Sequence, residues 1–354
     1  MGAYKMRNNN KLSRKTLNSY FEDYLEVYAI PRIRATTVEA YRNIWKAFVA
    51  DTFGKRKLAD ITRTMIIKSL NKTIKEKNPS NGTVDNITSL LSSCFDRAVT
   101  DGYILKNPAL KLEKDIAKGR KPKVKVALTD EQQQVFLKFL RESNVYNIYY
   151  PMFVFMFGTG TRIGEVSALT WEDVDFQKNM VTICRTICYK KGDQEKPHFI
   201  VNEPKTDAGN RQVPLMADVK KALIQQRRNK FALGIPKCEV CGISDYIFTT
   251  RTGKPYTNAG INAAVKRMIA AYNRQETEQA VQENREPYLL PDFSCHNTRH
   301  TFTTQLCQGT NDIKAIQDIL GHSDVSTTLN IYAHCTENQK RESMEELEKR
   351  IKLG

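Results

Sequence analysis

Histidines and an arginine share the segment SCHNTRHTF, residues 294–302, at spacings that suit two kinds of chemistry. His296 and His300 are four residues apart, which places both on one face of a helix at the spacing of a zinc-binding H-E-x-x-H helix. However, Asn297 stands where that motif needs a glutamate as general base, and the permanently charged Arg299 would adjoin any bound cation. The segment therefore argues against a metal site.

An anion fits the same segment better. His296 and Arg299 are three residues apart, so both can converge on one group. The planar guanidinium offers a fork that matches two phosphate oxygens. We therefore predict a phosphate-binding motif, with His300 assigned to packing or a local hydrogen bond.

A second arginine lies in GTGTRIGEVSALTWEDVDF, residues 158–176. Arg162 is predicted in the first turn of a helix, where free backbone N–H groups and the helix dipole favour an anion. Glu165 can hold its guanidinium in place, and Val166 and Leu169 should face inward. Taken alone, an arginine at a helix start is usually a surface residue.

Three more side chains could take part in the chemistry. His322 follows the glycine that ends an amphipathic helix at residues 313–320, and Tyr332 lies on the next short helix. Lys205 is predicted at the edge of a β-turn in NEPKTDAGNRQVPL, from which a long cationic side chain can reach a ligand. Taken singly, such a tyrosine is usually a half-buried core residue, and such a lysine is normally solvated.

The elements that must position these side chains form a mainly α-helical chain with a small antiparallel β-sheet. Residues 15–110 read as a four-helix bundle, one of whose helices we predict to begin at a capping box of Thr36 and Glu39. A basic tail at residues 1–14 precedes it. The segment 111–127 is basic, holds one Gly and one Pro, and has little apolar periodicity, so we predict a linker there.

The second predicted domain, residues 128–335, mixes helices and strands. It should open with a capping box of Thr129 and Gln132. Three β-rich runs between residues 180 and 215 predict one small antiparallel sheet, and the polar stretch 275–288 predicts an exposed excursion. A charged helix with a narrow apolar stripe follows at residues 336–354.

Composition restricts the class of partner. The formal net charge is +16 and the sequence pI about 9.4, which indicates a polyanionic partner. The polar, basic N-terminus is unlike a signal peptide, and the apolar run 148–158 is far shorter than a bilayer span, so we expect a soluble, cytoplasmic protein. Cys238 and Cys241 have zinc-knuckle spacing, but a second ligand pair is not evident nearby, and an ordinary loop is the simpler interpretation.

In chain order, the motifs TGTRIGEVSALTWEDVD, the hairpin lysine, HNTRHTF and LGHSDVSTTLNIYAH resemble the tyrosine recombinases, the phage integrase family. The resemblance runs from about Leu17 to the end of the chain, and within the family it is strongest to integrases of conjugative transposons and related mobile elements of Gram-positive bacteria. It implies a helical core-site DNA-binding domain followed by a mixed α+β catalytic domain. The implied catalytic set is Arg162, Lys205, His296, Arg299, His322 and Tyr332.

The resemblance also implies the reaction. Tyr332 would attack the scissile phosphate to form a 3′-phosphotyrosyl link, and strands would be exchanged through a Holliday junction during integration or excision of a mobile element. Arg162 and Arg299 would bind the phosphate, His296 would accept the phenolic proton, and Lys205 would protonate the leaving 5′-oxygen. The link stores the energy for rejoining, so neither ATP, a metal nor any other cofactor is expected.

Partners follow from the same resemblance. We expect double-stranded DNA with core or crossover sites, a homotetramer on DNA coupled through the tail 336–354, and an excisionase-type accessory protein, all at the nucleoid. The tail could instead pack on its own domain. Only about 15 residues precede the first predicted helix, so a separate arm-binding domain is expected to be absent or removed.

Two other functions use similar residues. A type IB topoisomerase has a comparable catalytic set, but the helical domain and the spacing from LGH to the tyrosine argue against it. A DNA-binding regulator with a decayed site is the second alternative, and the six occupied positions argue against decay.

Overall fold

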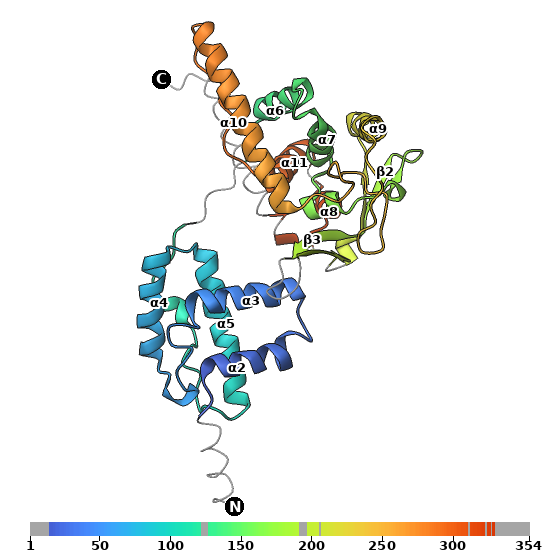
Figure 1. Cartoon of the computed structure of the whole chain (residues 1–354). Helices are drawn as coiled ribbons and strands as arrows, with labels where there is room; N and C mark the ends of the chain where they lie inside the picture. The colour runs from blue at the N-terminus through green and yellow to red at the C-terminus, as the bar shows by residue number, and fades with distance from the viewer. Residues whose placement is uncertain are drawn as a thin grey trace, which may run out of the picture. The chain divides into compact units, whose positions relative to one another are not determined.

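The computed structural model of the chain describes residues 14–121, 127–190, 197–204, 207–310, 312–322, 324–326 and 328–329. The chain divides into two compact units, Met1–Val124 and Lys125–Gly354, drawn in Figure 1. In these described segments, no helix has both the length and the apolar character that crossing a membrane requires.

The first unit is helical, as the sequence predicts. Its helices are α2 (Leu17–Tyr24), which continues into a π-helical turn (Leu25–Ala29), α3 (Ala35–Phe48), α4 (Arg63–Lys77) and α5 (Asn81–Thr100). The predicted capping box at Thr36 is wrong. The N-cap of α3 is Arg34, whose carbonyl oxygen already accepts hydrogen bonds from the N–H groups of Thr37 and Val38.

Aromatic side chains fill the centre of this unit. Trp45 of α3 stacks on Phe21 of α2 with ring centroids 3.8 Å apart and planes 2° from parallel. The indole N–H of Trp45 donates to Asn18 at 2.9 Å, so its one polar group is satisfied inside the bundle. This pair fixes α2 and α3 against each other.

The predicted linker is described as far as Lys121, and this part packs on the helical unit. Leu112 is fully buried in the same core. The Arg63 guanidinium forms an ion pair with Asp115, and the Arg120 carbonyl accepts from the N–H of Asn81 at 3.0 Å. Residues 111–121 are therefore held to the helices by apolar, ionic and backbone contacts.

The second unit is built around one buried helix. Its helices are α6 (Asp130–Glu142), α7 (Tyr150–Thr159), α8 (Ile163–Ser167), α9 (Ala217–Ala232), α10 (Asn258–Gln282), α11 (Cys295–Gly309) and α12 (Ile313–Leu320). Helix α7 is buried over most of its length and packs against α9 and α11. The capping box of Thr129 and Gln132 is confirmed at the start of α6.

Strands form two small antiparallel sheets where the sequence predicts one. The order is β1 (Val174–Asp175), β2 (Met180–Ile183) and β5 (Arg211–Pro214) in one sheet, and β3 (Thr186–Lys190) with β4 (His198–Asn202) in the other. The run 179–191 breaks between β2 and β3. There Arg185 turns toward Thr170, 2.9 Å away, and forms an ion pair with Asp173.

The polar stretch 275–288 is exposed at most positions, as predicted, but its first half is part of a helix. Helix α10, the long orange helix of Figure 1, extends through Gln282. Glu276 on it is buried, forms an ion pair with Arg285, and accepts from the N–H of Tyr288 at 2.9 Å. The chain after α10 thus folds back onto the helix.

Candidate active site

Arg162 occupies the junction between α7 and α8. Helix α7 ends at Gly160, whose left-handed φ of 62° turns the chain, and Arg162 is the N-cap of α8. Its side chain is 43% exposed. Its Nη1 donates to Glu165 Oε1 at 2.8 Å and its backbone N–H to Oε2 at 2.9 Å. The predicted role of Glu165 in holding this guanidinium is confirmed.

Glu165 is shared by a second arginine. Arg211, on β5, donates through Nη2 to Glu165 Oε2 at 2.9 Å and through Nη1 to Oε1 at 3.4 Å. Burial alone would raise the pKa of Glu165, but the positive charges and hydrogen bonds of Arg211 and Arg162 outweigh it and hold that pKa at about 2. Glu165 is therefore an anion at neutral pH and ties the two arginines together.

Arg299 is buried and bonded to the main chain of two other elements. It is only 4% exposed, and its Nη1 and Nη2 donate to main-chain oxygens: Gly160 at 2.9 Å and Leu320 at 2.7 Å. Burial and then the charge of Arg162 lower the pKa of Arg299, to about 9, so it stays cationic at neutral pH. This side chain therefore joins the C-terminal ends of α7 and α12.

His296 differs in exposure from Arg299, although both lie on α11. His296 is exposed, whereas Arg299 is buried, so the prediction that they project together is only partly met. The rings of His296 and His300 meet edge to face with centroids 4.6 Å apart. The contact gives His300 the packing role expected for it.

His322 lies directly after the C-cap of α12, as predicted. Gly321 has a φ of 64° and ends the helix, and His322 is 8% exposed. Its Nδ1 is 2.9 Å from the hydroxyl of the buried Thr328. Burial, followed by the charges of Arg299 and Arg162, lowers the pKa of His322 to about 4. The imidazole is therefore neutral at neutral pH and acts as a hydrogen-bonding group.

Three predicted side chains thus converge where α7 ends, α8 begins and α12 ends: Arg162, Arg299 and His322. Lys205 and Tyr332 lie outside the described residues, as does the tail 336–354. Within the described part of the chain, no three His, Cys, Asp or Glu side chains are grouped as a metal site requires. The described groups supply fixed N–H donors and positive charge, which suit a phosphate.

Sequence reasoning missed Arg211. The pattern that could have identified it is the alternation of buried and exposed residues along strand 211–214, in which Arg211 and Val213 are buried and Gln212 and Pro214 are exposed. An arginine on the buried face of a strand needs an anionic partner, because an unpaired buried charge is costly. Thr328 was also missed, and its partner His322 lies six residues earlier.

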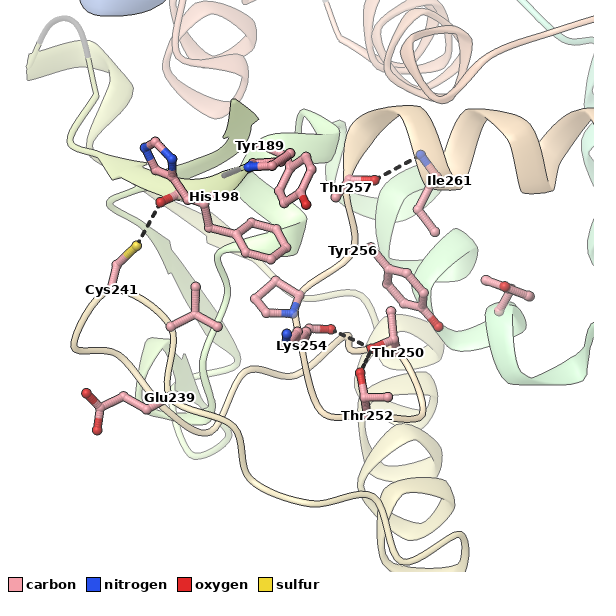
Figure 2. Close-up of a pocket in the computed structure, with 16 residues that line it drawn as sticks. Tyr189, His198, Glu239, Cys241, Thr250, Thr252, Lys254, Tyr256, Thr257 and Ile261 are labelled. Atoms are coloured by element: carbon pink, nitrogen blue, oxygen red, sulfur yellow. Dashed lines mark hydrogen bonds between the residues drawn. The ribbon is translucent and has the colours of Figure 1, made fainter. Parts of the chain in front are cut away.

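A separate cavity of about 800 Å³ lies elsewhere in the second unit (Figure 2). His198 and Cys241 are on one side of the view, and Tyr256 and Thr257 on the other. Cys241 donates from Sγ to the Phe199 carbonyl at 3.2 Å, as expected of an ordinary loop cysteine. None of the four described residues of the predicted catalytic set lines this cavity.

Comparison with known proteins agrees with this architecture. The model of the phage integrase family matches residues 127–339, and that of the phage integrase N-terminal SAM-like domain matches residues 16–74. The transposase from transposon Tn916 of Enterococcus faecalis is 28% identical over 324 residues, which cover 90% of this chain and 74% of that protein. A XerC-like tyrosine recombinase of Caldanaerobacter subterraneus is 28% identical, covering 94% and 82%.

Among solved structures, the Tn1549 transposon integrase in complex with transposon right end DNA superposes with a TM-score of 0.78. It is 27% identical, and the match covers 94% of this chain and 99% of that one.

The two phage-integrase family matches, one on the helical unit and one on the mixed unit, together with the likeness to the Tn1549 integrase, identify the class as a site-specific DNA recombinase. The family match covers more than half of the 354 residues. The chain belongs to the phage integrase family, and it is a tyrosine recombinase of the type found in conjugative transposons.

Proposed function

We propose that this recombinase cleaves DNA with Tyr332 and holds the scissile phosphate with Arg162 and Arg299. His296 accepts the phenolic proton, and Lys205 protonates the leaving 5′-oxygen. His322 donates a hydrogen bond to a phosphate oxygen. The product is a 3′-phosphotyrosyl link, and exchange proceeds through a Holliday junction during integration or excision of a mobile element.

The arrangement around Glu165 is the observation that carries this proposal. Arg162 is held by Glu165 at 2.8 Å with its side chain 43% exposed, so it keeps N–H groups for a ligand. Arg299 and His322 both adjoin the end of α12. Burial lowers the pKa of His322 most, and the positive charge of Arg299 lowers it further. Donors fixed before the reaction stabilise developing charge without reorganisation.

The chemistry needs such a site. A tyrosine has an ordinary pKa near 10, so attack at neutral pH requires a base or a strongly cationic environment. The attack places a second negative charge on the phosphorus oxygens, which Arg162 and Arg299 would offset. Neutral His322 adds a hydrogen bond and no charge, and its Nδ1 is engaged with Thr328, which orients the ring.

The DNA partner follows from charge and from the relatives. The net charge of +16 favours a polyanion, and the Tn1549 integrase was solved with transposon right end DNA and with circular intermediate DNA. In our proposal, residues 15–110 bind the core site, residues 128–335 form the catalytic domain, and the tail 336–354 docks on a neighbouring protomer of a tetramer. An excisionase-type accessory protein sets the direction, and the enzyme works on DNA at the nucleoid.

A nicked suicide duplex carrying the core site tests the proposal. Wild-type protein should form a covalent protein–DNA adduct, Tyr332→Phe none, and Arg162→Lys much less. Tyr272→Phe is the matched control for the tyrosine, since its hydroxyl only donates to the Tyr288 carbonyl. Arg141→Lys, on the exposed surface of α6, is the control for the arginine.

The outcomes separate the alternatives. A wild-type protein that binds the duplex but forms no adduct would be a DNA-binding regulator. An adduct without exchange between two core-site duplexes, together with relaxation of supercoiled DNA, would indicate topoisomerase activity. EDTA should leave the adduct rate unchanged, and a loss of cleavage in EDTA would restore the metal-dependent alternative.

A further inference from the structure

Arg211 connects two parts of the active site that the chain brings together from far apart. Its side chain is 5% exposed. The Nη atoms grip both oxygens of Glu165, 46 residues earlier, and Nε donates to the carbonyl of Ile319, 108 residues later, at 2.8 Å. One planar guanidinium thus binds α8 and the last turn of α12 at once.

Each of these contacts adjoins a predicted catalytic group. Oε1 of Glu165 accepts a hydrogen bond from Arg162 Nη1 at 2.8 Å, and the same oxygen accepts from Arg211 Nη1. Ile319 is three residues before His322, and the next carbonyl, that of Leu320, accepts from Arg299. A shift of Arg211 would therefore move the supports of several phosphate-facing side chains together.

The backbone is shaped for this contact. Gly321 has a φ of 64°, and a Cβ there would lie 2.9 Å from Cδ of Arg211 and 2.7 Å from the carbonyl oxygen of Ala208. A glycine is thus required both by the turn and by the close approach of Arg211. The turn before His322 and the arginine occupy one tightly packed space.

We propose that Arg211 is a positioning residue for strand cleavage: it sets the spacing between the Arg162–Glu165 pair on α8 and the turn that carries His322. This inference rests on the proposed function. Arg211 acts through Glu165 and through the end of α12. A misplacement of catalytic groups by about 1 Å can slow a reaction roughly 100-fold.

A lysine cannot replace this geometry. An ammonium is a point charge and does not reproduce a flat fork whose Nε bonds one partner while both Nη atoms bond another. Arg211→Lys preserves the charge near Glu165 and loses the bridge, whereas Arg211→Gln loses both. The pair of variants therefore separates geometry from charge.

The test uses the full chain in a Trp45→Phe background, so that Trp171 is its one tryptophan. Three quantities are measured: affinity for the core-site duplex, the adduct rate at saturating suicide DNA, and the folded fraction from the fluorescence of Trp171. Both variants should bind DNA within about threefold of wild type and form adduct roughly 10- to 100-fold more slowly per folded molecule. Arg285→Lys and Arg285→Gln are the matched controls. Arg285 also pairs with a buried glutamate, Glu276. On α10, Glu276 lies 14 residues, or about 21 Å by helix rise, from Asn262, which accepts from the backbone N–H of Cys295 at the start of α11.

A pH profile adds a readout that a purely structural role would not change. Glu165 faces Arg162 on its own helix, Arg211 from β5, Arg299 from α11 and His322 after α12. In Arg211→Gln, the pKa of Glu165 should rise, because the positive charge that counteracts the effect of burial is gone. The adduct rate of this variant should therefore fall further below the wild-type rate as pH drops from about 7.5 to 5.5.

The inference is overturned if the Arg211 variants cleave at the wild-type rate per folded molecule. It is also overturned if they lose adduct only in proportion to unfolded protein, or if the Arg285 variants slow cleavage equally. Absence of an adduct with wild-type protein would instead refute the proposed function, so the two failures are distinguishable.

Discussion

Replacing Glu165 by glutamine removes a buried negative charge at nearly constant volume. The carboxylate accepts from Arg211 at 2.9 Å and from Arg162 at 2.8 Å, and it is 8% exposed. In Glu165→Gln, Arg211 keeps its position in the interior but loses its anion. An uncompensated buried charge should lower the free energy of unfolding of the second unit.

The size of this loss in the free energy of unfolding follows from the pKa of Glu165. That pKa falls from an ordinary 4.5 to about 2 on folding, and at 1.36 kcal/mol per pKa unit the shift corresponds to about 3 kcal/mol. Because the folded-state pKa is the lower one, this stabilisation is fully present above about pH 4.5 and is lost as pH falls through 2. Breaking a buried ion pair by removing one partner typically costs about 3–5 kcal/mol, which agrees.

The assay can report on the second unit alone. The chain has two tryptophans, Trp45 in the first unit and Trp171 in the second. In a Trp45→Phe background, urea unfolding is followed by the fluorescence of Trp171. The Glu165→Gln substitution should lower the free energy of unfolding by about 3 kcal/mol at pH 7 and by roughly half of that or less at pH 3.

The control is Glu278→Gln, an exposed carboxylate on α10, which should change the unfolding free energy by less than about 0.5 kcal/mol. A Glu165→Gln effect that stays the same from pH 7 to pH 3, or that is below about 1 kcal/mol at pH 7, would refute the ion-pair reasoning.

Three further outcomes are expected. Thr328→Val removes the hydroxyl that holds His322 Nδ1 and should slow adduct formation roughly 10-fold at unchanged DNA affinity; Ser326→Ala, exposed on the same short helix, should have no effect. Gly321→Ala forces a side chain into a left-handed turn with a contact below 3 Å, and should lower the unfolding free energy by about 1–3 kcal/mol in the urea assay. Thr129→Ala breaks the capping box of α6 and should cost about 1 kcal/mol while folded protein keeps its adduct rate.

Local features of the site could be predicted from the sequence because their partners are near in the chain. Glu165 lies three residues after Arg162, one helical turn away, and the contact follows from that spacing. Gly321 ends α12 as a left-handed C-cap, which places His322 where the sequence predicts it. Such pairs depend on backbone geometry that a single element determines.

Contacts between distant elements could not be predicted in this way. The Nη atoms of Arg299 bond the Gly160 and Leu320 carbonyls, 139 and 21 residues away, and neither contact follows from its spacing to His296. Arg211 went unnoticed because both of its partners lie on other elements. The spacing of residues within one helix does not reveal which other elements pack against that helix in the fold.

The predicted helix starts were also only partly correct. The capping box at Thr129 forms, but that at Thr36 does not, although both have the required polar residue three positions later. At Thr36 the chain is already helical, since the Arg34 carbonyl accepts the first bonds of α3. A motif of two polar residues therefore indicates a helix start only to within a turn.

In the proposed reaction, the shared carboxylate would also set the charge that the site offers to the scissile phosphate. Arg162, Arg211 and Arg299 are cationic, Glu165 is anionic, and His322 is neutral at neutral pH, so these groups leave two net positive charges. A phosphodiester carries one negative charge, and attack by a phenolate gives a pentacoordinate state that carries two. In the proposed cleavage, these five side chains would therefore match the transition state in charge better than the bound DNA, which is the condition for binding energy to accelerate the reaction.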